Sequence, residues 1–127
     1  MFAQDYYTTI NTSTNISVEA LNLVEFTSPQ LAAAEADAAD WISDNGSNAV
    51  RVAAASRTYN CHNYAWHYSD GGTNLWVNQL DQNYAENLTK YWSGASPTYQ
   101  QTTSSNATKV FYSEGDHSTL ELKPQGL

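Results

Sequence analysis

The residues with the richest chemistry lie between Ser56 and Gly72, in the sequence SRTYNCHNYAWHYSDGG. This stretch contains the only cysteine of the chain, Cys61, and two of its three histidines, His62 and His67. A cysteine can act as a nucleophile, bind a metal or fill a core, and its surroundings decide which of these roles it takes.

Cys61 is predicted to open a helix. Asn60 is a favourable N-cap residue, and Asp70-Gly71-Gly72 would end the helix after about Tyr68. The unpaired N–H groups at a helix start favour the thiolate, which is the nucleophilic form of cysteine. Helical spacing would place Tyr64 on the same face as the thiol.

A thiol nucleophile needs a base close in space, and in proteins this base is usually histidine. His117 is the candidate because it would open a strand directly after a tight turn. His62 would point about 100° away from Cys61 around the helix, and His67 lies almost two turns along it. The sequence therefore predicts Cys61 as nucleophile and His117 as base.

Two other interpretations of the cysteine stay open. A lone cysteine is more often part of a core than a nucleophile. A metal site would use Cys61, His62, His67 and either Asp116 or His117, but the motifs CxxC, HxxxH and HExxH are all absent from the sequence. We therefore expect neither a metal nor another cofactor.

Aromatic residues surround the cysteine in the sequence. They can line a substrate groove or fill the core that a small domain needs, and we expect most of them in the core. The candidate substrate-binding residues near Cys61 are Asn60, Tyr64, Trp66 and Trp76.

The clearest helix signal outside this stretch is TSPQLAAAEADAADWISDNG. Thr27 or Ser28 would be its N-cap, and Asn45-Gly46 would supply a left-handed stop. Its apolar positions recur at three and four residues, so one stripe is expected to face a core. These positions are Leu31, Ala34, Ala38, Trp41 and Ile42.

The other elements are predicted from weaker patterns. Residues 5–17 are expected to be extended or poorly ordered, and residues 18–26 form either a short strand or a helical turn. A third helix is expected over 80–92. Residues 109–112 and 118–123 are rich in β formers and read as two strands around a turn at 114–116.

Length and charge limit the classes of function. With 127 residues the chain is predicted to be one domain, 1–127. It has 13 acidic against 5 basic residues and a net charge of −8, which argues against nucleic acid or an anionic membrane as partner. No run of 18 apolar residues occurs, so no membrane span is expected.

The sequences YNCHNYAWH (59–67), LWVNQ (75–79) and TKVFYSEGDHS (108–118) resemble the papain-like thiol hydrolases of bacteria, the NlpC-type and CHAP amidase and peptidase superfamily. In that family a cysteine opens a helix packed on an antiparallel sheet, and a histidine begins a following strand. The resemblance implies an α+β, papain-like fold with N-terminal helices packed on a small antiparallel sheet. It also implies Cys61 as nucleophile and His117 as base.

The activity that the resemblance implies is hydrolysis of peptide or amide bonds, most often in cell-wall peptides of the peptidoglycan type. Such an enzyme would be secreted or periplasmic. The Cys61 N–H would hold the oxyanion. The alternative function is a non-catalytic binding or assembly module on the same scaffold, with the aromatic residues as its contact surface.

The family usually has a third polar residue on the strand after the histidine strand, and this sequence has no such strand. Glu121 lies on the histidine strand itself, about 13 Å from His117 at about 3.3 Å per residue, and should not reach the imidazole. Asn60, Asn63 or another chain remain as sources of an orienting group. A homo-oligomer that completes the short sheet, a truncated chain and an inactive relative also remain open.

Overall fold

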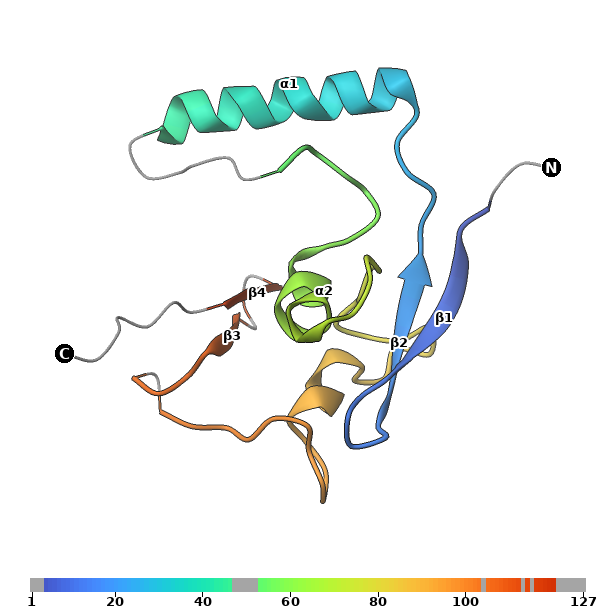
Figure 1. The fold of residues 1–127 in the computed structure, drawn as a ribbon, viewed down its shortest axis with the longest axis vertical. Helices are drawn as coiled ribbons and strands as arrows, with labels where there is room; N and C mark the ends of the chain where they lie inside the picture. Colours follow the sequence, from blue (N-terminus) through green and yellow to red (C-terminus); the bar gives the residue numbers. More distant parts are fainter. Residues whose placement is uncertain (1–3, 47–52, 104, 113, 115, 121–127) are drawn as a thin grey trace.

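The computed structural model describes residues 4–46, 53–103, 105–112, 114 and 116–120. Within these ranges the chain has two α-helices, two short 3-10 helices and two antiparallel sheets of two strands each (Figure 1). The expected mixture of helices and antiparallel strands is confirmed, and its papain-like form stays a prediction. In chain order the elements are β1 (Tyr6–Asn11), β2 (Ser17–Asn22), α1 (Ser28–Asn45), α2 (Cys61–Trp66), η1 (Tyr68–Asp70), η2 (Leu88–Tyr91), β3 (Lys109–Tyr112) and β4 (His117–Leu120).

The N-terminal part of the chain is a β-hairpin of β1 and β2. Ile10 pairs with Val18 across the two strands, and both side chains are buried. Ala20 is also buried while Ser17 is exposed, which is the alternation of a strand with one face on a core. The expected extended lead-in over residues 5–17 is therefore a strand as far as Asn11, and Thr12 to Ile16 form the hairpin turn instead. The stretch after it begins as a strand, β2.

Helix α1 forms where the sequence predicts it. Thr27 is its N-cap, and a reciprocal capping box joins Thr27 and Gln30, in which the Thr27 N–H donates to Gln30 Oε1 over 3.0 Å. The expected left-handed stop is wrong, because Gly46 has a right-handed backbone with φ −58°. Alanine propensity and the capping box stabilise this helix locally.

The apolar stripe of α1 faces no core formed by the described residues, which corrects the sequence-based expectation. No residue of α1 is buried among the described residues, and Trp41 is 58% exposed. The helix stands apart from the strands in Figure 1. The Ala55 N–H donates to Glu35 Oε1 over 2.8 Å and links the helix to the chain that leads to α2.

The predicted third helix over 80–92 is also wrong, except for its last turn, η2. Leu80 instead forms an isolated antiparallel bridge with Glu86. The Asp81 carboxylate accepts the N–H groups of Asn83 and Ala85 at 2.8 and 3.0 Å, and Tyr84 has φ 61°. An aspartate that bonds the following backbone in this way competes with helix formation.

The core lies between the hairpin, α2 and η2. Its buried apolar residues are Ile10, Val18, Ala20, Ala65, Trp66, Leu75, Val77, Leu88 and Tyr91. A buried amide holds the hairpin to the loop before η2: Asn87 Oδ1 accepts from the Glu19 N–H at 2.8 Å, and Asn87 Nδ2 donates to the carbonyls of Glu19 and Asn78 at 2.8 and 3.0 Å.

Asn87→Ala is expected to lower the free energy of unfolding by roughly 2–4 kcal/mol, because it removes the three part-buried hydrogen bonds that the buried Asn87 amide makes to the backbone of Glu19 and Asn78. Urea denaturation followed by circular dichroism measures this change. Asn83→Ala is the matched control, since Asn83 is exposed on the same segment, and we expect it to change stability by less than about 0.5 kcal/mol. Equal effects of the two substitutions would contradict the bracing role of Asn87.

Candidate functional site

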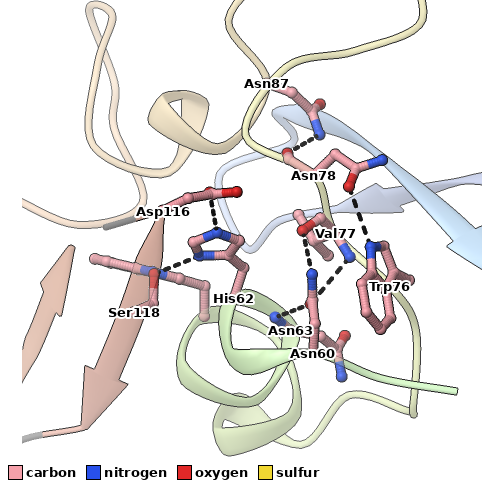
Figure 2. A network of polar contacts seen from close by, with 10 residues as sticks. Asn60, His62, Asn63, Trp76, Val77, Asn78, Asn87, Asp116 and Ser118 are labelled. Atoms are coloured by element: carbon pink, nitrogen blue, oxygen red, sulfur yellow. Dashed lines mark hydrogen bonds and ion pairs between the residues drawn. The ribbon is translucent and has the colours of Figure 1, made fainter. Parts of the chain in front are cut away.

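Cys61 is the first residue of α2, as the sequence predicts, and Asn60 is the N-cap. Asn60 Oδ1 accepts from the N–H groups of Asn63 and Val77 at 3.1 and 3.2 Å, and its Nδ2 donates to the Val77 carbonyl at 2.7 Å (Figure 2). The Asn60 amide therefore fixes the start of the helix against the 75–79 segment. With these three hydrogen bonds made, the Asn60 amide has little capacity left to bind substrate or to orient an imidazole.

The thiol of Cys61 is free and partly exposed. One turn along α2, Tyr64 is 47% exposed and stacks on Tyr68 with ring centroids 5.8 Å apart. These two rings form an open aromatic surface beside the helix. Tyr64 is the predicted substrate-binding residue that the structure leaves most accessible.

His62 is the buried histidine of the site and connects α2 to the start of β4. Its side chain is almost fully buried, with Nδ1 2.7 Å from Ser118 Oγ and Nε2 2.8 Å from Asp116 Oδ1. Trp66 Nε1 donates to the same Ser118 hydroxyl over 2.9 Å. Figure 2 shows the His62 ring between Asp116 and Ser118.

One tautomer of His62 satisfies every polar group in this network. A carboxylate only accepts, so Nε2 carries the proton toward Asp116. The Ser118 hydroxyl then accepts from Trp66 Nε1 and donates to His62 Nδ1. Both ring nitrogens are thus engaged, and neither is left to take a proton from Cys61. The low expectation for His62 as base agrees with this geometry, although its structural role was not foreseen.

His117 begins β4, as expected, but its ring lies on the exposed side. It stacks on Tyr112, its partner on β3, with centroids 6.1 Å apart. Side chains alternate along a strand, so His117 points to the face opposite the buried Ser118. Within the described part of the chain its ring nitrogens make no hydrogen bond, and none joins it to Cys61. The pairing of Cys61 with His117 stays a prediction.

The two tryptophans predicted to bind substrate have structural contacts. Trp66 is buried at the end of α2, whereas Trp76 is half-buried and donates from Nε1 to Asn78 Oδ1 over 3.1 Å. Asn63, considered as an orienting group, is fully buried and donates to the Thr73 carbonyl over 3.2 Å. Glu121 and the end of the predicted strand over 118–123 lie outside the described residues.

Ser118 and its role are what the sequence reasoning missed. The signal that could have found it is the alternation of side chains along the predicted strand, which sets Ser118 on the opposite face from His117. Asp116 precedes the strand in a turn, with φ 45°, so alternation does not predict its contact. In the described ranges, no three His, Cys, Asp or Glu side chains gather as a metal site would require. No helix within those ranges is long and apolar enough to cross a bilayer.

No protein-family model matches the sequence, and neither a curated protein nor a solved structure matches it.

His67, the C-cap of α2, is held tightly against a glycine. A Cβ at Gly72 would lie 2.3 Å from the His67 ring, so only glycine fits there without a shift. The Thr73 N–H donates to His67 Nε2 over 3.3 Å, which requires that nitrogen to be unprotonated. Burial lowers the pKa of His67 below its ordinary value, against the smaller opposing effect of the Asp70 carboxylate.

We expect the free energy of unfolding to fall as the pH is lowered from about 7 to 5. The unfolded chain binds a proton at His67 more readily than the folded chain, so this stability is present above about pH 6.5 and is lost below it. His67→Gln should flatten the pH dependence in this window when urea midpoints are compared. The carboxylates of Asp5, Glu25 and Asp81, whose pKa values hydrogen bonds hold low, affect only a more acidic range. An unchanged slope in the variant would refute the assignment to His67.

Proposed function

We propose that the protein is a thiol hydrolase that cleaves peptide or amide bonds, with Cys61 as nucleophile and His117 as base. The single observation that carries the proposal is the position of β4 against α2. Asp116 and Ser118 both bond the ring of His62, the residue next to Cys61. His117 lies between them in the chain, so its backbone is held near the start of the helix that bears the thiol.

The chemistry at Cys61 is nucleophilic acyl transfer. The thiolate attacks the carbonyl carbon of the scissile bond, and the amine leaves with a proton from the imidazolium of His117. Water then attacks the resulting thioester, the imidazole takes its proton, and the carboxylic acid leaves as the thiol is regenerated. The Cys61 N–H, as the first of the helix, has no carbonyl partner in the preceding turn and can donate to the oxyanion.

His117 is the base in this proposal because its nitrogens bond no residue in the described part of the chain, whereas both nitrogens of His62 are engaged in hydrogen bonds. The proposal requires the His117 imidazole to leave its stack on Tyr112 and the first residue of β4 to twist, because its side chain points to the face of the strand opposite the one that α2 covers. The stack lies at an exposed position, with Tyr112 48% exposed, so water can replace it at low cost.

A second candidate function is a binding or assembly module without catalysis. The observation that favours it is the outward direction of His117, which leaves the thiol without a base in hydrogen-bonding contact among the described residues. In this alternative the exposed rings of Tyr64 and Tyr68 form part of the contact surface.

The rate of Cys61 alkylation by iodoacetamide between pH 5.5 and 9, followed by intact-protein mass spectrometry, separates the two functions. An ordinary thiol is mostly protonated at pH 6.5 and reacts slowly. If the pair forms, we expect wild type to react at pH 6.5 roughly tenfold or more faster than His117→Ala. Tyr112→Ala is the matched control, because it removes the same stack and leaves the imidazole; its rate should equal or exceed that of wild type.

A pH profile indifferent to His117 would reject the hydrolase proposal and favour the binding module. Loss of reactivity in both His117→Ala and Tyr112→Ala would mean that the stack itself matters, and it too would reject His117 as base. Circular dichroism of each variant shows whether the fold is retained.

A further inference from the structure

A cavity of about 460 Å³ lies between β3 and the segment that follows η2. This volume falls within the range of small-molecule sites in proteins. Four aromatic rings line it: Trp66, Trp92, Tyr99 and Phe111. Neither the thiol nor any histidine is part of its wall, so the cavity is separate from the site proposed around Cys61.

The rings form a continuous and well-fixed wall. Trp92 lies 4.8 Å from Trp66 and 5.4 Å from Phe111 between ring centroids, and Tyr99 meets Trp66 edge-on at 5.3 Å. Trp66 is held in turn by its hydrogen bond to Ser118. The wall therefore offers flat apolar surfaces in fixed positions.

The remaining lining is rich in neutral polar side chains. Gln100, Gln101 and Asn106 contribute primary amides, and Thr102 and Thr108 contribute hydroxyls. Each amide provides two donors and an acceptor, and each hydroxyl provides one donor and an acceptor. An apolar ligand would leave many of these groups without a partner, whereas a ligand with adjacent hydroxyl groups can pair with them.

The cavity has no charge available for an ionic ligand. None of its lining residues is acidic, and its single cation is Lys109. The Lys109 ammonium donates to the Ala65 carbonyl, to Ser69 Oγ and to Asp70 Oδ1, which uses all three of its hydrogens. This cation is thus committed to the end of α2 and to η1, and the ligand that fits is uncharged.

We propose that this cavity binds a pyranose ring of a neutral glycan. A pyranose has an apolar C–H face that can lie on an aromatic ring and a rim of hydroxyls that can pair with the amides. Whether the sugar carries acetamido groups is a matter for the experiment. The site does not depend on the proposed hydrolase activity, because no group of the Cys61 site takes part in it.

The test is a titration of the full chain with neutral oligosaccharides, observed through the indole N–H signals of its four tryptophans by NMR. The probes are glucose oligomers and N-acetylglucosamine oligomers; glucosamine oligomers and galacturonate oligomers serve as cationic and anionic comparisons. We expect saturable shifts of the Trp66 and Trp92 signals with at least one neutral probe. The Trp41 signal, from an exposed ring on α1, should not move.

Variants decide whether binding occurs in this cavity. Asn106→Ala and Gln101→Ala change exposed residues and should weaken binding about tenfold, the equivalent of about 1.4 kcal/mol, with the fold retained. Trp92→Ala should abolish binding if it folds, and Trp41→Ala, a matched loss of a tryptophan elsewhere, should leave the affinity unchanged.

Several results would overturn the proposal. One is the absence of saturable shifts with every neutral probe, and another is tighter binding of a charged oligomer. Binding of a neutral sugar that is insensitive to Asn106 and Gln101 would place it elsewhere. An unstructured peptide that binds with equal affinity would indicate pairing along the backbone of β3 instead, which would not need those side chains.

Discussion

The hydroxyl of Ser118 is the contact on which both candidate sites depend. It accepts the indole N–H of Trp66 and bonds the imidazole of His62, so it holds the two ends of α2 to one strand. His62 is the sequence neighbour of Cys61, and Trp66 lines the aromatic cavity. Buried polar networks of this kind rigidify a structure when every member is satisfied and are costly when one partner is lost. A single strand residue therefore sets the position of the helix that carries Cys61 and of the cavity wall together.

Side-chain amides pair with many backbone N–H and C=O groups that helices and sheets would pair in larger domains. The described elements are short, and long loops join them, so many backbone groups need partners outside helices and sheets. Asn60 pairs both backbone groups of Val77, and Asn87 pairs both backbone groups of Glu19. Some of the asparagines in the sequence thus serve to pair backbone groups inside the fold, in addition to those that lie exposed at the surface. Asn106, exposed beside the aromatic rings, contributes one such amide to the proposed glycan cavity, whose neutral polar lining is otherwise glutamine and threonine.

Local signals made part of this arrangement predictable. Capping residues defined the starts of α1 and α2, and β-forming residues around a turn defined β3 and β4. Two of the wrong predictions rest on periodic spacing. Such spacing shows neither which segment packs against the apolar face nor whether a local turn competes with the helix. The stripe of α1 predicted a core contact that the described fold does not provide, and the turn at Asp81 outweighed the helical spacing of residues 80–92. The role of His62 depends on partners more than fifty residues away, which no local pattern contains.

The choice between the two histidines as base follows from what each would lose by serving Cys61. His62 would give up a hydrogen bond to Ser118 or to Asp116, and a buried polar group left without its partner costs roughly 1–3 kcal/mol. His117 would give up only its contact with Tyr112 at the surface, where an aromatic pair contributes about 0.5–1.5 kcal/mol and water is at hand. The buried histidine fixes the helix to the strand, and the exposed one keeps the freedom of movement that the proposed proton transfer would need. A catalytic role for His117 thus requires α2 and the rest of β4 to stay intact while the exposed first residue of the strand changes direction.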